Sequence, residues 1–140
     1  MSRRQFLGFI PLVLVARPMA AMAGRAGPSL RSGRQHPKHP TPRPGITAAK
    51  VLPDSKVPDK GARRVFAMVR EIPQVVDGIR CNCGCAELEG FYSLLSCYEE
   101  VGMAQHCAIC QGQAKLAYRM HKDGFSLDAI RRAVDAEFGE

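Results

Sequence analysis

The stretch Cys81-Asn82-Cys83-Gly84-Cys85, continued by Cys97 and by Cys107-Ala108-Ile109-Cys110, holds all six cysteines of this 140-residue chain. Thiolates bind soft metal ions strongly, and thiols also pair as disulfides and exchange electrons. The stretch therefore predicts a centre built on sulfur, around which the rest of a small domain must fold.

The spacing within this stretch predicts that the sulfurs converge. Asn82 and Gly84 are the residue types that best tolerate positive φ, so the loop can curl and turn several thiols toward one point. Cys107 and Cys110 lie one turn apart at the expected start of a helix, where unpaired amides and the helix dipole favour thiolates. Cys97 is expected on the core side of the preceding helix.

The sequence on either side of the cysteines predicts helices. Ala62, Val65, Phe66 and Val69 follow the i, i+3, i+4, i+7 spacing of one buried helix face, and Pro73 is expected to end that helix. No segment shows the period-2 alternation of a strand. We therefore expect an all-α fold, a small bundle of about four short helices with a Cys-rich loop. The expected helices span residues 61–72, 86–101, 107–122 and 127–138.

The N-terminal segment has the pattern of a signal peptide covering residues 1–23. Arg3 and Arg4 precede a short apolar run, and Ala21-Met22-Ala23 is a small-x-small cleavage site. Adjacent arginines ahead of Phe6 are typical of twin-arginine signals, which address proteins to the twin-arginine translocation machinery. The apolar run is too short to cross a bilayer. We expect an exported protein, periplasmic or otherwise extracytoplasmic, with no membrane span after cleavage.

Residues 24–60 are expected to form a disordered linker. They hold seven of the ten prolines and eight Lys and Arg against two Asp, a composition that disfavours helices and strands. His36 and His39 are interpreted as polar filler. Residues 61–140 carry nine Lys and Arg against eleven Asp and Glu, so the positive charge belongs to the N-terminal segments. That balance argues against a nucleic-acid partner.

The domain at residues 61–140 is small and contains no Trp. Domains of this size commonly add a metal or disulfides to a modest hydrophobic core. All six cysteines are candidate metal ligands. Two histidines are weaker candidates: His106 directly precedes the Cys107-x-x-Cys110 turn, and His121 lies fourteen residues after Cys107 on about the same face of the predicted 107–122 helix. Sulfur with imidazole suits copper(I) or zinc. An iron–sulfur cluster is an alternative, although the spacing matches no standard ferredoxin run.

Two other classes of function stay open. An exported domain of this size with an even number of cysteines could be a disulfide-stapled interaction domain without a cofactor. Cys107-x-x-Cys110 at a helix start could instead serve a thiol-redox or electron-transfer protein, but no βαβ pattern surrounds it. Export in a folded form favours a metal, because binding a metal folds a small site. No catalytic triad, carboxylate pair or phosphate loop is present, so we do not expect an enzyme.

The stretch Ile79-Arg80-Cys81-Asn82-Cys83-Gly84-Cys85, with Cys97 and Cys107-x-x-Cys110, resembles the bacterial exported proteins named for a Pro-Cys-Tyr-Cys-Gly-Cys motif. The resemblance covers residues 72–138 and implies metal binding. Arg80 and Asn82 replace the Pro and Tyr of the motif, and Phe91 stands where many relatives have His. A looser likeness is to exported copper-storage four-helix bundles. Their thiols line every helix, whereas the thiols here gather at one end, so storage of many ions is not expected.

Overall fold

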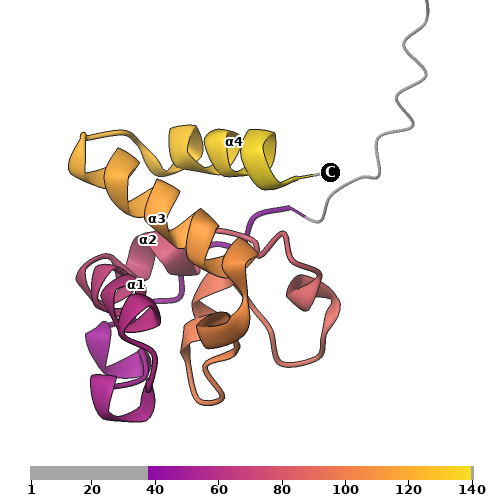
Figure 1. Cartoon of the computed structure of the whole chain (residues 1–140). Coiled ribbons are helices and arrows are strands. Elements are labelled where there is room, and N and C mark those ends of the chain that lie inside the picture. The colour runs from indigo at the N-terminus through magenta and orange to yellow at the C-terminus, as the bar shows by residue number, and fades with distance from the viewer. Residues whose placement is uncertain (1–37, 140) are drawn as a thin grey trace, which may run out of the picture. The chain divides into compact units, whose positions relative to one another are not determined.

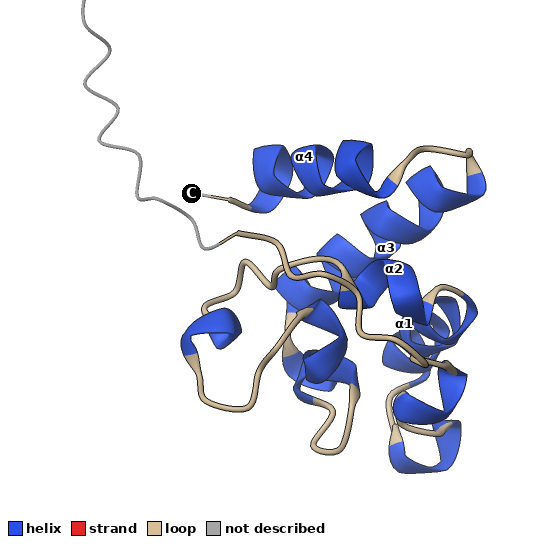
Figure 2. Cartoon of the chain, turned by 180° about the vertical axis from the view of Figure 1, so that it is seen from behind, coloured by secondary structure: helices blue, strands red, loops and turns tan. Residues whose placement is uncertain are grey.

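The structure is a computed structural model that describes residues 38–139. The predicted signal peptide and the first part of the predicted linker lie outside the described residues. The described chain is all helical, as expected, and no strand occurs within it. Figures 1 and 2 show the arrangement of the helices from two sides. The α-helices are α1 (Lys60–Glu71), α2 (Pro73–Asp77), α3 (Ala108–Lys122) and α4 (Leu127–Phe138). The 3-10 turns are η1 (Ala48–Lys50), η2 (Asp54–Lys56), η3 (Cys85–Glu87), η4 (Leu94–Tyr98) and η5 (Met103–His106).

Helix α1 forms where the apolar spacing predicts it. Asp59 caps its start by accepting a 2.6 Å hydrogen bond from the amide of Ala62. The predicted stripe is buried, and Phe66 packs edge-on against Tyr98 with ring centroids 4.8 Å apart. Pro73 does end α1, but the chain continues at once into α2. Proline is tolerated at the first position of a helix, where its missing amide has no partner to lose.

The predicted helix over residues 86–101 is wrong. This segment forms the short turns η3 and η4 with an irregular loop between them, in which Gly90 has φ +86°. The helix was expected from apolar residues spaced for one face, among them Leu88, Leu94, Leu95 and Val101. Leu94 and Leu95 are buried, but Leu88 is 52% exposed and Val101 is 76% exposed. Spacings of three residues fit a 3-10 turn as well as an α-helix, so the pattern did not distinguish the two.

The prediction of a disordered linker is wrong for residues 38–60. This segment wraps around the helices, forms η1 and η2, and buries four aliphatic side chains in the common core. Arg43 secures it through a 2.7 Å contact with the fully buried carboxylate of Asp77. The burial of these apolar side chains therefore holds in place a segment whose composition disfavours helices and strands. The buried aliphatic residues are Ile46, Val51, Leu52 and Val57.

Helices α3 and α4 form a hairpin, and α3 also contacts α1 (Figure 1). Gly124 takes φ +83° after α3, and the amide of Phe125 donates back to the carbonyl of Met120, so that a glycine cap ends the helix. Ser126 caps α4 through the amide of Ala129 at 3.3 Å. Gly112 allows the close approach of α4, because a Cβ there would lie 2.8 Å from the ring of Phe138.

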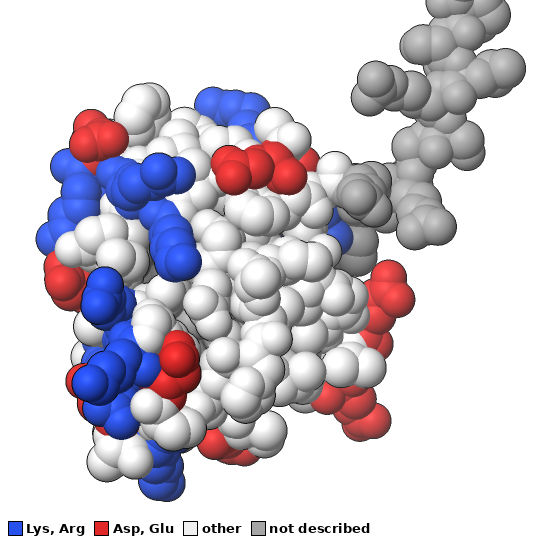
Figure 3. Space-filling view, viewed as in Figure 1, with Lys and Arg blue, Asp and Glu red and all other residues white. Residues whose placement is uncertain are grey.

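Charged side chains occupy the margins of the face drawn in Figure 3, with Lys and Arg concentrated on the left, and the middle of this face is uncharged. Within residues 38–139, no helix combines the length and the apolarity needed to cross a membrane.

Candidate metal centre

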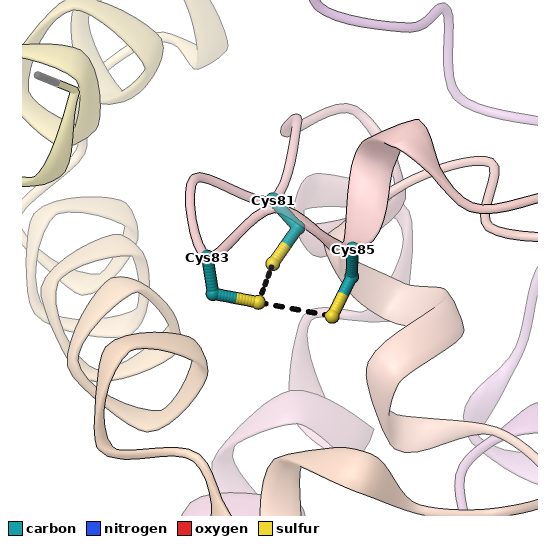
Figure 4. A group of neighbouring side chains, drawn as sticks. All are labelled: Cys81, Cys83 and Cys85. Atoms are coloured by element: carbon teal, nitrogen blue, oxygen red, sulfur yellow. Dashed lines mark hydrogen bonds between the residues drawn. The ribbon is translucent and has the colours of Figure 1, made fainter.

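The six predicted cysteine ligands converge in the structure. Three come from the loop before and at η3, one from η4, and two from the start of α3. All six are free thiols. Figure 4 shows the loop curled so that the sulfur of Cys83 lies between those of its neighbours, 3.1 Å from Cys81 and 3.0 Å from Cys85. Cys110 reaches the same point from α3, with its sulfur 3.6 Å from Cys81 and 3.4 Å from Cys83. The sulfur of Cys97 lies 3.6 Å from that of Cys81, and Cys107 completes the cluster within 4.8 Å of Cys83 and Cys110.

Three groups of three sulfurs surround the centre of the cluster, and the sulfurs in each group lie within 4.8 Å of one another. The centre itself is the close set of Cys81, Cys83 and Cys110, whose sulfurs lie 3.1–3.6 Å apart. We call the three groups the first, second and third triads. They are Cys81/Cys83/Cys85, Cys81/Cys97/Cys110 and Cys83/Cys107/Cys110, respectively. The structure thus brings together every cysteine that the sequence singled out, and it does so in groups large enough to hold a metal ion.

The local backbone explains how the loop curls. Gly84 has φ +90°, and no atom lies within 4 Å of a Cβ placed there, so glycine serves the backbone conformation alone. Asn82 does not adopt the positive φ that an asparagine tolerates. Its amide is instead held by the side chain of Gln113 at 3.0 Å.

Cys107 occupies the N-cap of α3, as its position before the helix predicted. Its sulfur accepts from the amide of Cys110 at 3.5 Å. Burial opposes ionisation of Cys107, but the amide and thiol of Cys110 outweigh it, so the pKa of Cys107 lies below its ordinary value. The helix start therefore favours a thiolate at the edge of the cluster.

The thiols also couple to one another. Contacts from Cys110 and Cys97 lower the pKa of Cys81, because those neighbours donate to a thiolate at the centre. The same contact with Cys81 raises the pKa of Cys110, which keeps its proton. Burial and the contact with Cys85 raise the pKa of Cys83. The surroundings thus favour thiolates at Cys81 and, at the edge, at Cys107, whereas ionising the remaining thiols at these distances would need a cation among them.

Two buried residues that the sequence did not reveal support the cluster. Gln113, fully buried on α3, places its side-chain amide 3.9 Å from the sulfur of Cys81 while its oxygen holds Asn82. Tyr98 donates to the carbonyl of Cys110 at 2.8 Å. Such outer contacts orient ligands and restrict their motion. Gln113 could have been suspected because it follows Cys110 by three residues and so shares its helix face.

The weaker histidine candidates do not join the cluster. His106 and His121 are both exposed, and no group of potential ligands among residues 38–139 contains either one. His121 follows Cys107 by fourteen residues, a separation of about 21 Å along a helix. Sharing one helical face therefore did not bring it near the thiols.

His39, which the sequence analysis interpreted as filler, instead holds the cysteine loop in place. Its Nδ1 accepts from the amide of Arg80 at 3.0 Å, and its Nε2 lies 2.9 Å from a carboxylate oxygen of Asp135. Because an amide can donate only to an unprotonated nitrogen, the Nε2 atom carries the proton that Asp135 accepts. This arrangement ties the 38–60 segment, the loop and α4 together.

Arg80 adds a buried positive charge beside the loop. Its side chain is 8% exposed and lies 3.7 Å from Asp135, and its Nε and Nη2 atoms have no hydrogen-bond partner. Arg80 immediately precedes Cys81. A buried guanidinium is costly unless negative charge lies nearby, and the carboxylate of Asp135 supplies that charge here.

The pattern of contacts favours shared ligation over pairing. A disulfide framework gives each sulfur one partner at about 2.05 Å, whereas Cys81 and Cys83 each lie 3.0–3.6 Å from three other sulfurs. No protein-family model, curated protein or solved structure matches the chain. The interpretation of the site therefore depends on its geometry.

Proposed function

We propose that this protein is an exported metal-binding protein that holds a soft metal ion, copper(I) or zinc, through the thiolates of its six cysteines. The observation that carries the proposal is the convergence of all six sulfurs into three overlapping triads. The expected role is metal handling or structural support of the domain, and not catalytic turnover.

The donor set argues for a soft ion. The three triads contain only sulfur, with no carboxylate or imidazole. Calcium and magnesium prefer oxygen ligands, whereas thiolates favour copper(I), zinc or iron–sulfur clusters. The resemblance of the cysteine stretch to the Pro-Cys-Tyr-Cys-Gly-Cys proteins points the same way.

The burial of the thiols is compatible with handling. Cys81, Cys97 and Cys110 are almost completely buried, whereas Cys83 and Cys107 are half-buried. The centre thus has a protected interior and one edge nearer to solvent. A metal can be retained by the buried sulfurs and exchanged through that edge, because ligand exchange needs an accessible sulfur.

The export proposal has a separate test, since residues 1–23 lie outside the described structure. Replacing Arg3 and Arg4 together with Lys should stop delivery to the periplasm if the signal uses the twin-arginine route. The readout is the fraction of the protein in the periplasm and its N-terminal residue after processing. Unchanged delivery would contradict twin-arginine export, whereas the metal proposal would stand.

The metal proposal is tested by native mass spectrometry and thiol counting on the protein recovered from the periplasm. We expect bound copper or zinc, and six thiols that react with an alkylating agent after chelation. Cys81→Ser should lower the metal content, whereas Met103→Leu, which removes a sulfur outside the cluster, should not. A metal-free protein that is lighter by six hydrogens would contradict the proposal and indicate three disulfides. Visible absorption with bound iron would contradict it in favour of an iron–sulfur cluster.

A further inference from the structure

The three triads are linked in a regular way. The first and second share Cys81, the first and third share Cys83, and the second and third share Cys110. Each pair of triads therefore has one sulfur in common and no more. Three sulfurs remain that belong to one triad each. They are Cys85, Cys97 and Cys107.

This linkage fits an octahedron, of which the three triads supply nine of the twelve edges, three from each triad. Three triangles that share one corner pairwise can be three alternate faces of an octahedron with six corners. The fourth alternate face consists of the three remaining corners, which we call the fourth triad (Cys85, Cys97 and Cys107). None of the sulfur contacts at 3.0–3.6 Å joins two of its members, so this face would close only when the cluster is loaded. In such an arrangement every sulfur belongs to two of the four faces.

The close sulfur contacts agree with this arrangement. The octahedron defined by the triads places three pairs of sulfurs at opposite corners, namely Cys81 and Cys107, Cys83 and Cys97, and Cys85 and Cys110. Opposite corners should be the most distant pairs. None of the five sulfur contacts at 3.0–3.6 Å joins an opposite pair, and all five follow edges.

The number of sulfurs in each group distinguishes between the two candidate metals. Each of the three triads offers three sulfurs. Structural zinc takes four ligands in a tetrahedron, one more than a triad provides. Copper(I) is bound by soft thiolates and is stable with three of them in a plane. A triad therefore presents the number and type of donors that a copper(I) site needs.

We propose, building on the metal-binding function proposed above, that the six cysteines hold one cluster of four copper(I) ions. Each ion lies over one triad, and each sulfur bridges two ions. Loading consumes four copper(I) ions from a copper(I) donor and releases six protons from the six thiols. Copper keeps its oxidation state, and the product of four single positive charges and six thiolates has a net charge of −2.

The surroundings suit a cluster with this charge. Cys107 and Cys110 sit at the start of the fifteen-residue helix α3, whose dipole is positive at that end. Arg80 precedes Cys81 in the sequence and is buried beside Asp135, with no hydrogen-bond partner for its Nε and Nη2 atoms. The interior of the cluster is shielded, because the sulfurs of the second triad are almost completely buried. The third triad contains both half-buried cysteines and forms the accessible edge.

The test is an anaerobic titration of the full, reduced chain with copper(I) supplied as a weak nitrile complex, followed by native mass spectrometry. We expect the four-copper form to accumulate beside the metal-free form, with few intermediates, and all six thiols to resist alkylation. X-ray absorption should show three sulfur neighbours per copper and scattering between copper atoms. Saturation at any other number of coppers would overturn the cluster while leaving the metal-binding function intact. A chain that binds neither copper(I) nor zinc would overturn both.

Single substitutions give a second test. Because every sulfur belongs to two triads, Cys85→Ser and Cys107→Ser should each abolish the four-copper form, although these residues differ in burial. A single-ion site would instead tolerate the loss of at least two of the six cysteines without a change in stoichiometry, which would contradict the proposal. Met103→Leu should retain four coppers. Circular dichroism of each variant before loading establishes that it is folded.

Discussion

The side-chain oxygen of Gln113 accepts a 3.0 Å hydrogen bond from the backbone amide of Asn82, so that helix α3 holds the cysteine loop at its middle. The same side chain places its amide nitrogen 3.9 Å from the sulfur of Cys81. One buried glutamine thus connects the helix that carries Cys110 to the loop that carries three other sulfurs. This contact holds the loop and the helix at a fixed distance from each other.

Gln113→Leu should loosen the loop at nearly constant volume. The amide of Asn82 would be buried without a partner, at a cost of about 1–3 kcal/mol in the free energy of unfolding. Loss of an outer contact of this kind weakens metal binding by about 10- to 100-fold. Urea unfolding of the metal-free protein and competition with a chelator measure the two effects.

Gln111→Leu is the matched control. Gln111 lies on the same helix and donates to the carbonyls of Ala104 and Gln105, which belong to η5 and not to the cysteine loop. It should lower stability while changing metal affinity less than Gln113→Leu does. Equal effects of the two variants on affinity would show that Gln113 has no particular role at the centre.

Gly84→Ala and Gly90→Ala form a second matched pair. Both glycines have positive φ, +90° and +86°, and a Cβ at either would meet no atom within 4 Å. Each substitution should therefore cost roughly 1–2 kcal/mol through backbone strain alone. Only Gly84 lies between cysteines of the first triad, so only Gly84→Ala should weaken copper(I) binding in a competition assay. Equal affinity for both variants would indicate that the loop conformation does not set the site.

The helices that could be predicted from the sequence are those with local signals. Helices α1, α3 and α4 each combine a 3.6-residue apolar spacing with a cap, at Asp59, Cys107 and Ser126 respectively. The 86–101 segment lacks such a signal, because its three-residue spacing suits a 3-10 turn equally well. Gly90, at positive φ between η3 and η4, lies where the predicted helix would have continued.

The cysteine ligands of the site were predictable because their residue type and their spacing in the sequence both indicate a shared centre. Their clustering predicted convergence, and the position of Cys107 predicted a helix start. The supporting residues were not predictable, since they act over long separations in the sequence. His39 pairs with Asp135 across 96 positions, and Arg43 reaches Asp77 across 34. The two histidine candidates do not join the described ligand groups, because His121 lies near the far end of α3 and the side chain of His106 is exposed although it adjoins Cys107.

Because residues 38–60 are folded against the helices, removing them should destabilise the domain. A chain that begins at residue 38 should fold and bind metal, because it keeps every described core residue. A chain that begins at residue 61 would lack four buried aliphatic side chains, each worth about 1.5–3 kcal/mol. We expect it to show no cooperative unfolding transition in urea.

The two truncations should also differ in metal binding, as measured by titration with copper(I). The shorter chain loses His39, which holds the amide of Arg80 next to Cys81. Cooperative unfolding of the chain starting at residue 61, with unchanged metal stoichiometry, would show that the segment is a dispensable tether after all.

The buried carboxylate of Asp77 makes the free energy of unfolding depend on pH in the acid range. Burial alone would raise the pKa of Asp77, but hydrogen bonds from Arg43 and from Ser93 outweigh it, so the pKa lies below its ordinary value. When the pH falls below about 4, the unfolded chain takes up a proton that the folded chain refuses. The contribution of Asp77 is therefore complete above that pH and is lost progressively below it.

Asp77→Asn tests this assignment. Removing the charge leaves Arg43 beside Glu99 alone and should cost about 3 kcal/mol of unfolding free energy at pH 7. The difference between the wild type and the variant should then shrink as the pH falls from 5 to 3, because the wild type loses the same interaction by protonation. Urea unfolding of the metal-free, reduced proteins at each pH measures this difference.

Asp54→Asn is the control. Asp54 is an exposed partner of Arg70, so its replacement should leave the free energy of unfolding almost unchanged at every pH. A difference for Asp77→Asn that stayed constant down to pH 3 would mean that the buried carboxylate is not the group that titrates, and that the 38–60 segment is held by packing alone.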